Sequence, residues 1–192
     1  MTTSDKSLAN WKHHVAASAA YDPAAMNLRI ARFDEIPASP RAFVDTWVEG
    51  HQRTLMSVIG SGVTDNPDFK PRIAAAENFH VDFIIAPKGC GAAMHWHTTE
   101  EVFIVQAGRW EVDWLDGVSG DVHTVTLNPR DTISVPPRVH RSFRNLDGDA
   151  GMLISILGGK LPDRVKWDRS LEQEARAVGA GFDDDGTAVK FD

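Results

Sequence analysis

Residues 89–101 carry the clearest chemical pattern in the chain, and they read Gly89-Cys90-Gly91-Ala92-Ala93-Met94-His95-Trp96-His97-Thr98-Thr99-Glu100-Glu101. His95 and His97 are two residues apart, and on a β-strand that spacing places both imidazoles on the same face. Glu101 follows four residues after His97. A turn through Thr98 and Thr99 would bring its carboxylate beside the imidazoles. The pattern therefore predicts three side chains that converge on one point.

Two neutral imidazoles and one carboxylate form a three-point grip on a divalent metal ion and leave coordination positions open. Fe(II) is the favoured ion, because this ligand set is used by non-haem iron oxygenases, and Mn, Ni, Co or Zn can occupy similar sites. A His-x-His pair alone is common without a metal, and a single histidine on a strand is usually a hydrogen-bonded structural residue. The metal hypothesis therefore depends on His95, His97 and Glu101 together, in their surrounding spacing.

Short segments rich in β-branched and aromatic residues fill the region from residue 54 to residue 158, and Gly, Pro, Asp and Asn separate them. They predict strands over residues 54–59, 79–86, 101–106, 110–115, 122–127, 132–135 and 152–157. The alternation is clearest in Trp110-Glu111-Val112-Asp113-Trp114, where the apolar and acidic side chains take opposite faces. Many short strands at close spacing predict an all-β sandwich or barrel.

The two ends of the chain have sequence patterns typical of helices rather than strands. Residues 1–50 are predicted to form a partly helical N-terminal arm, with alanine dense over residues 16–20 and a helix from Arg41 to Val48 that Gly50 ends. A second helix is expected from about Trp167 to Val178, with Gly179 as its natural stop. The predicted division is therefore an arm over residues 1–50, a barrel over residues 51–160, and a C-terminal helix and tail over residues 161–192.

The spacing of five fixed residues adds a family resemblance. Gly89, His95, His97, Glu101 and Gly108 stand at the positions of the first motif of the cupin superfamily, so residues 50–160 resemble a cupin of the RmlC-like kind. The resemblance implies a double-stranded β-helix, or jelly-roll barrel, with helical arms at both ends and the metal inside the barrel. It also implies a homodimer, because flanking strands in this superfamily often exchange between subunits.

The second cupin motif is present with departures. Pro136 and Asn145 match it, but Arg138 stands at its glycine position and Arg141 at its third histidine ligand, while His140 lies one residue early. In one interpretation the loop shifts by one residue and His140 reaches the metal. In the favoured interpretation strand parity holds, so that Arg141 points into the barrel. There it would pair with Glu101 or bind a substrate carboxylate or phosphate.

Composition limits the remaining classes of function. The chain has 192 residues, one cysteine and a formal net charge of −7. Its Lys and Arg residues are scattered, which argues against a nucleic-acid partner. No apolar run approaches the length of a membrane span, and the N-terminus does not resemble a secretion signal. We therefore expect a cytoplasmic protein with a small-molecule substrate, without a nucleic-acid or membrane partner.

Three functions follow from these residues. The favoured one is an Fe(II)-dependent dioxygenase for a small anionic or chelating substrate, with Glu101 and His140 as catalytic residues and Arg141 binding the substrate. The second is a non-oxidative metal-dependent isomerase or lyase, in which the ion polarises a carbonyl and His140 or Glu100 moves a proton. The third is a non-catalytic cupin that binds a small molecule.

Overall fold

The computed structural model describes residues 19–148, 150–160 and 163–191, and it divides the chain into two compact units, residues 1–30 and 31–192. In the first unit, helix α2 (Pro23–Asn27) begins after Asp22, whose Oδ1 accepts a hydrogen bond from the Ala25 backbone N–H at 2.7 Å. No helix in the described residues is long and apolar enough to cross a membrane.

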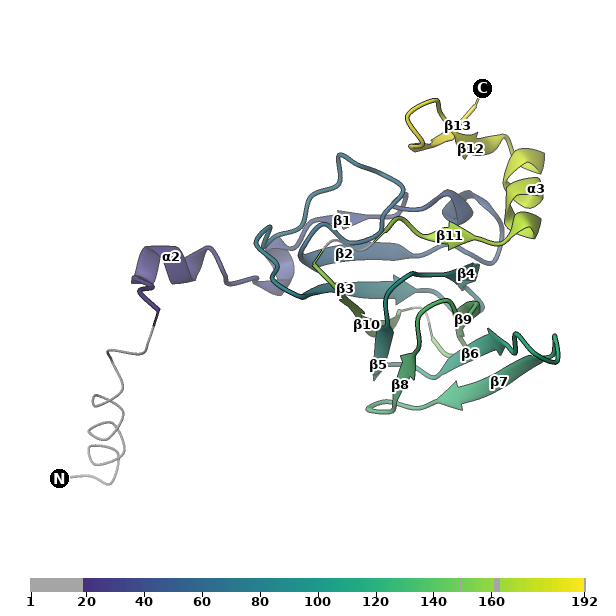
Figure 1. Cartoon of the computed structure of the whole chain (residues 1–192), viewed down its shortest axis with the longest axis horizontal. Helices are drawn as coiled ribbons and strands as arrows, with labels where there is room; N and C mark the ends of the chain where they lie inside the picture. Colours follow the sequence, from purple (N-terminus) through teal and green to yellow (C-terminus); the bar gives the residue numbers. More distant parts are fainter. Residues whose placement is uncertain (1–18, 149, 161–162, 192) are drawn as a thin grey trace. The chain divides into compact units, whose positions relative to one another are not determined.

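The second unit is built on two antiparallel sheets (Figure 1). The first has the order β1-β2-β3-β10-β5-β8, with bounds Ala38–Ser39, Thr54–Ile59, Phe79–Ala86, Gly151–Gly158, Glu101–Ala107 and Thr132–Val135. The second has the order β11-β4-β9-β6-β7, with bounds Lys166–Trp167, Gly91–Trp96, Arg141–Asn145, Trp110–Leu115 and Val122–Leu127. Strand β5 of the first sheet thus follows β4 of the second directly along the chain, which places a turn between His97 and Glu101.

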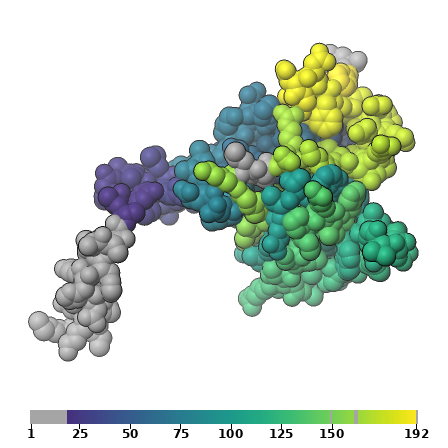
Figure 2. All heavy atoms as spheres, in the orientation of Figure 1, coloured from purple at the N-terminus to yellow at the C-terminus, as the bar shows by residue number. Residues whose placement is uncertain are grey.

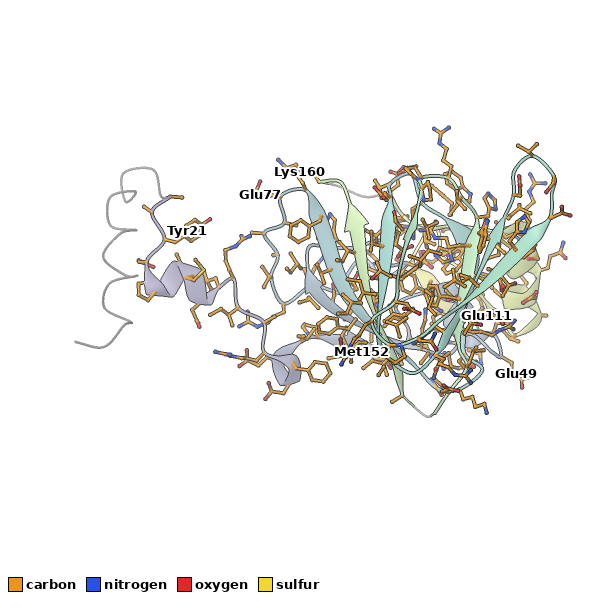
Figure 3. The ribbon with its side chains drawn as sticks, turned by 90° about the horizontal axis from the view of Figure 1, so that it is seen from below. Tyr21, Glu49, Glu77, Glu111, Met152 and Lys160 are labelled. Carbon is orange, nitrogen blue, oxygen red and sulfur yellow. The ribbon has the colours of Figure 1, made fainter. Side chains whose placement is uncertain are left out.

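Alternation along the strands points one face of each sheet inward. In β3 and β10 every second residue is buried over the whole strand, which is the pattern of a half-buried strand. Side chains fill the space that the strands enclose (Figure 3). The main core cluster is Ala42, Phe43, Leu55, Val63, Ile84, Ala86, Ala92, Phe103, Val105, Trp110, Val112, Leu127, Val135, Phe143, Leu153, Leu157 and Val165.

A C-terminal layer, yellow in Figure 2, lies at one end of this unit. It consists of helix α3 (Arg169–Ala177) and the hairpin of β12 (Ala180–Phe182) and β13 (Ala188–Lys190). Leu171, Ala175, Ala180 and Ala188 pack with Ala93 of β4 in one buried cluster. The layer therefore supports the strand that carries His95.

All seven predicted strands are present, as β2, β3, β5, β6, β7, β8 and β10, and one predicted helix is not. The α-helix predicted from Arg41 to Val48 is replaced by the short 3-10 helix η3 (Val44–Trp47), because Phe43 is extended with φ −137° and ψ 151°. The N-terminal 3-10 helix η2 spans Phe33–Glu35. The alanine-rich residues 16–18 lie outside the described residues, and the boundaries near residues 50 and 160 stay predictions. The C-terminal helix is present as α3.

Backbone geometry explains one departure from the cupin motif. Arg138, at the motif's glycine position, has φ +67°, a left-handed conformation that costs a residue with a Cβ about 1–2 kcal/mol. Its backbone N–H donates a hydrogen bond to the carbonyl of His97 at 2.8 Å, and its side chain is exposed. The loop therefore keeps the glycine-type turn against the His97 backbone in spite of the substitution.

Replacing Arg138 with glycine should stabilise the protein, because glycine adopts this φ without strain while the backbone hydrogen bond to His97 is kept. We expect the free energy of unfolding in denaturant to rise by about 1 kcal/mol. Arg138→Ala is the matched control, since it removes the same side chain and keeps the strained Cβ, and it should give no such gain. Equal effects of the two substitutions would contradict the strain argument.

Candidate metal centre

The three residues that the sequence singles out come together inside the barrel. His95 is near the end of β4, His97 follows the strand, and Glu101 opens β5. Their side chains are buried, with 4%, 2% and 3% of the residue exposed. One ligand atom from each of the three lies within 4.8 Å of the others, and His97 Nε2 is 3.6 Å from Glu101 Oε2. The structure therefore brings these residues together as their spacing predicts.

Both imidazoles are neutral in this environment. Burial lowers the pKa of His95 well below its usual value, and the nearby Arg141 and His97 lower it further. Burial also lowers the pKa of His97 to about 4, against the opposing attraction of Glu101. His95 Nδ1 lies 2.7 Å from the carbonyl oxygen of Ala93, so Nδ1 donates and Nε2 keeps its lone pair. Neutral imidazole with a free lone pair is the form that binds a metal ion.

Glu101 is held in its ionised form by the groups around it. Burial alone would raise the pKa of its carboxyl, but Arg141, His97 and a hydrogen bond from Ser155 outweigh that effect and lower the pKa. Ser155 Oγ donates to Oε1 at 2.7 Å. Arg141 donates to Oε2 through Nε at 3.1 Å and also through Nη2. Both carboxylate oxygens therefore have protein partners.

Arg141 occupies the interior, as the strand-parity interpretation predicts. Its side chain is fully buried in β9, and its Nη1 donates to the carbonyl of Val139 at 3.3 Å. The neighbouring His140 is half-buried, and its ring is stacked on Trp96 at 6.1 Å between centroids, away from the three-residue group. Glu101 is thus the anionic partner of the buried Arg141 guanidinium in the structure. The role of Arg141 in binding a substrate stays a prediction, as does the catalytic role of His140.

A cavity of about 30 Å³ lies among these groups, lined by residues that include His95, His97, Glu101, Ser155 and Trp167. A volume of this size holds one or two water molecules or a single ion. Two neutral nitrogen donors and one anionic oxygen donor suit a divalent ion of the first transition series. His97 Nδ1 is buried without a partner among the described residues. The donor set therefore fits a metal ion, although Arg141 stands beside the oxygen ligand.

Asp82, which sequence reasoning missed, lines the same cavity. It lies on β3 with 4% of the residue exposed, and its Oδ1 has no partner in the part of the chain that the structure describes. Burial raises the pKa of Asp82 to about 7, a hydrogen bond with Ser57 opposes this, and Glu101 raises the pKa further. Its signal in the sequence is its position two residues after His80 on the predicted strand 79–86, which places both side chains on the same face.

Arg53 is the second cavity residue that the sequence did not reveal. Its Nη1 donates to Asp45 Oδ2 at 2.8 Å and to the carbonyls of His51 and Gly91, while Nε has no partner among the described residues. Its guanidinium lies over the Phe43 ring at 4.8 Å. Nothing in the sequence marks it, because it precedes β2 and meets these partners only through the fold.

Two other residues have structural contacts. His80 is buried on β3, where its Nε2 lies 3.2 Å from the Lys160 carbonyl and its Nδ1 lies 3.4 Å from the Gly62 backbone nitrogen. Cys90 is half-buried and its thiol donates to Gln52 Oε1 at 3.5 Å. Neither belongs to the three-residue group of His95, His97 and Glu101.

Comparison with solved structures supports the fold. Oxalate decarboxylase from Lactobacillus farciminis matches with a TM-score of 0.51 at 11% identity, over 68% of this chain and 33% of that protein. Peruvianin-I, a cysteine peptidase from Thevetia peruviana latex, matches with a TM-score of 0.52 at 14% identity, over 74% and 80% of the two chains. The polyketide cyclase RemF from Streptomyces resistomycificus matches with a TM-score of 0.51 at 16% identity, over 71% and 82%.

At these identities the likeness concerns the fold alone, and this chain spans one third of the length of the oxalate decarboxylase. No curated protein sequence matches the chain. Residues 81–157, from β3 to β10, match the family described as the cupin domain. The two-sheet architecture is accordingly a jelly roll. Residues 81–157 of this chain are therefore similar to the cupin domain.

Proposed function

We propose that the protein is a metal-dependent enzyme that holds one divalent ion at His95, His97 and Glu101 and acts on a small organic molecule. The observation that supports this most directly is the convergence of the three ligand atoms within 4.8 Å, all buried, in a cavity inside the sheet sandwich. Buried histidines that are neutral beside an ionised carboxylate form a site prepared for a cation.

Within this class we propose an Fe(II)-dependent dioxygenase, with Mn, Ni, Co or Zn as the other candidate ions. Bound iron would supply redox chemistry, and three protein ligands leave coordination positions open for a substrate that chelates through two oxygens. Such a substrate is a small anionic or chelating molecule, for example an enol, a diketone or a phenol. Two of the structural neighbours, the oxalate decarboxylase and the polyketide cyclase, are named as enzymes on this fold.

The chain's own residues give the site its geometry. The Ala93 carbonyl orients the His95 ring, and Ser155 holds one oxygen of Glu101. Phe143 and Leu55 line the apolar side of the cavity, which lowers the local dielectric constant and strengthens the electrostatic interactions within it. Hydrogen bonds such as those of the Ala93 carbonyl and Ser155 fix the tautomer and the orientation of a metal ligand.

A non-oxidative isomerase or lyase is the second candidate, and Asp82 is the observation that favours it. This carboxyl lines the cavity with a pKa of about 7 and is therefore suited to exchange a proton at neutral pH. The two bases considered from sequence lie elsewhere, since Glu100 is exposed and accepts a hydrogen bond from Ser134, and His140 is stacked on Trp96. We propose Asp82 as the proton carrier in this alternative. The homodimer also stays a proposal.

Replacing His95 with alanine should abolish metal retention, because it removes one of two nitrogen ligands. Elemental analysis of the purified protein, and of protein loaded with Fe(II) and then dialysed, measures this. His140→Ala is the matched control and should keep its metal, since that ring lies outside the three-residue group. Iron retained by His95→Ala would refute the ligand assignment, and iron lost from His140→Ala would show that the loop shifts in solution.

Oxygen uptake separates the two proposed reactions. The Fe(II)-loaded protein, assayed with a panel of diketones and phenols, should consume oxygen with at least one compound, and His95→Ala should not. Conversion of a compound without oxygen uptake, retained with Zn, would favour the isomerase or lyase. Neither uptake nor conversion, in protein that holds its metal, would contradict an enzymatic function and favour the binding module.

Asp82→Asn tests the raised pKa of that residue through stability. The folded state binds the proton of Asp82 more tightly than the unfolded state does, so Asp82 lowers the free energy of unfolding as pH rises from about 4 to above 7. The Asp82→Asn variant has no carboxyl at this position, so its free energy of unfolding does not show this decrease. In metal-free protein, its stability relative to wild type should therefore increase between pH 4.5 and 8, by up to roughly 4 kcal/mol at about 1.4 kcal/mol per pKa unit.

Denaturant unfolding at a series of pH values, with a chelator present, measures that difference. Asp113→Asn is the control, because Asp113 lies on the outward face of β6 and accepts hydrogen bonds from Thr124 and Ser142. Its stability curve should run parallel to that of the wild type. A parallel curve for Asp82→Asn as well would show that this carboxyl is ionised throughout the range.

A further inference from the structure

The Glu101 carboxylate is fully engaged by the protein before any ion arrives. Oε1 accepts from Ser155 at 2.7 Å, and Oε2 accepts from two nitrogens of the Arg141 guanidinium. Oε2 is also the oxygen that lies 3.6 Å from His97 Nε2. An ion held between His97 and Glu101 would therefore meet the oxygen that Arg141 already uses.

We propose that Arg141 is an internal competitor of the metal ion, so that the ion binds tightly only when the Arg141–Glu101 ion pair opens. This inference rests on the proposed metal-binding function. It adds that site occupancy is set by an exchange of one cation for another on Glu101. The residue at the third-histidine position of the cupin motif thus opposes metal binding.

Charge supports the exchange. Arg141 and Glu101 together contribute no net charge, so the two histidines and this pair offer a divalent ion no net attraction. A guanidinium does not lose its proton in a protein, and Arg141 is fully buried. Repulsion between two cations that share a buried anion is strong, because little water screens it. The ion and the guanidinium therefore exclude each other from Glu101.

The pair also explains how the fold tolerates the absence of an ion. An unpaired buried carboxylate is costly, and Arg141 removes that cost. The other hydrogen bond of the Arg141 guanidinium goes to the Val139 carbonyl, which carries no charge. Metal-free protein is consequently held by the ion pair, and displacement of Arg141 by an ion leaves that guanidinium in need of a new anionic partner.

If Arg141 instead supported metal binding, its removal would change the metal affinity in the opposite direction, and the experiment distinguishes the two roles by this difference. If Arg141 only positioned Glu101 for the ion, its removal would reduce stability and metal affinity together. If it competes, its removal reduces the stability of metal-free protein and increases metal affinity. The two quantities change in opposite directions in one case and in the same direction in the other.

The experiment measures Co(II) binding by equilibrium dialysis and the melting temperature in a chelator, for wild type and Arg141→Met. Methionine has a similar length and no charge. We expect the dissociation constant for Co(II) to fall at least tenfold and the melting temperature in chelator to fall by several degrees. Arg144→Met is the matched control, because Arg144 is an exposed residue of the same strand that pairs with Glu111, and its Co(II) affinity should stay within twofold of wild type.

Arg141→Gln provides a second variant that keeps a hydrogen-bond donor near Glu101 without the charge, and it should also bind Co(II) more tightly. Affinity that is unchanged or weaker in both variants, while wild type binds Co(II), would overturn the competition and leave the metal-binding function standing. If neither the wild type nor either variant binds Co(II), the proposed function and this inference are both overturned.

Discussion

A negative charge enclosed by two sheets is the constraint on which this site depends. Glu101 has 3% of its surface exposed, and a carboxylate so far from water must be met by a cation or by hydrogen bonds. Arg141 on β9 and Ser155 on β10 donate these hydrogen bonds to Glu101, and the two strands belong to different sheets. The same charge is what a metal ion at His95 and His97 would need. The Glu101 carboxylate is therefore both the ion-pair partner of Arg141 in the fold and the oxygen ligand in the proposed metal site.

Beside the three-residue group, a second buried ion pair connects the N-terminal segment of the barrel with β4. Arg53 forms a buried ion pair with Asp45 of the 3-10 helix η3, and Asp45 also accepts a hydrogen bond from the Ala93 backbone N–H at 3.0 Å. Ala93 in turn directs the His95 ring through its carbonyl. The N-terminal segment that leads into the barrel is thus linked to His95 through two contacts with Ala93 of β4.

The sequence predicted the convergence of His95, His97 and Glu101 because their geometry is local. His95 and His97 share one face of a strand and Glu101 begins the next strand, so spacing alone brings the three together. Strand parity likewise predicted the inward direction of Arg141. Asp82 and Arg53 were missed because they reach the cavity from β3 and from the start of β2, and only the order of strands in the first sheet brings those segments to it. The helix expected over residues 41–48 is absent for a related reason, since Asp45 is fully buried and bonded to Arg53 and to the Ala93 backbone N–H, which only the fold brings to it.

The central claim is that His95, His97 and Glu101 hold one divalent ion, and anomalous diffraction tests it most directly. Crystals grown with Fe(II) or Co(II), measured above and below the absorption edge of that metal, should show one strong anomalous peak inside the barrel, bonded to both histidines and to Glu101. No peak at that place, or an ion bound by other residues while these three side chains diverge, would contradict the account.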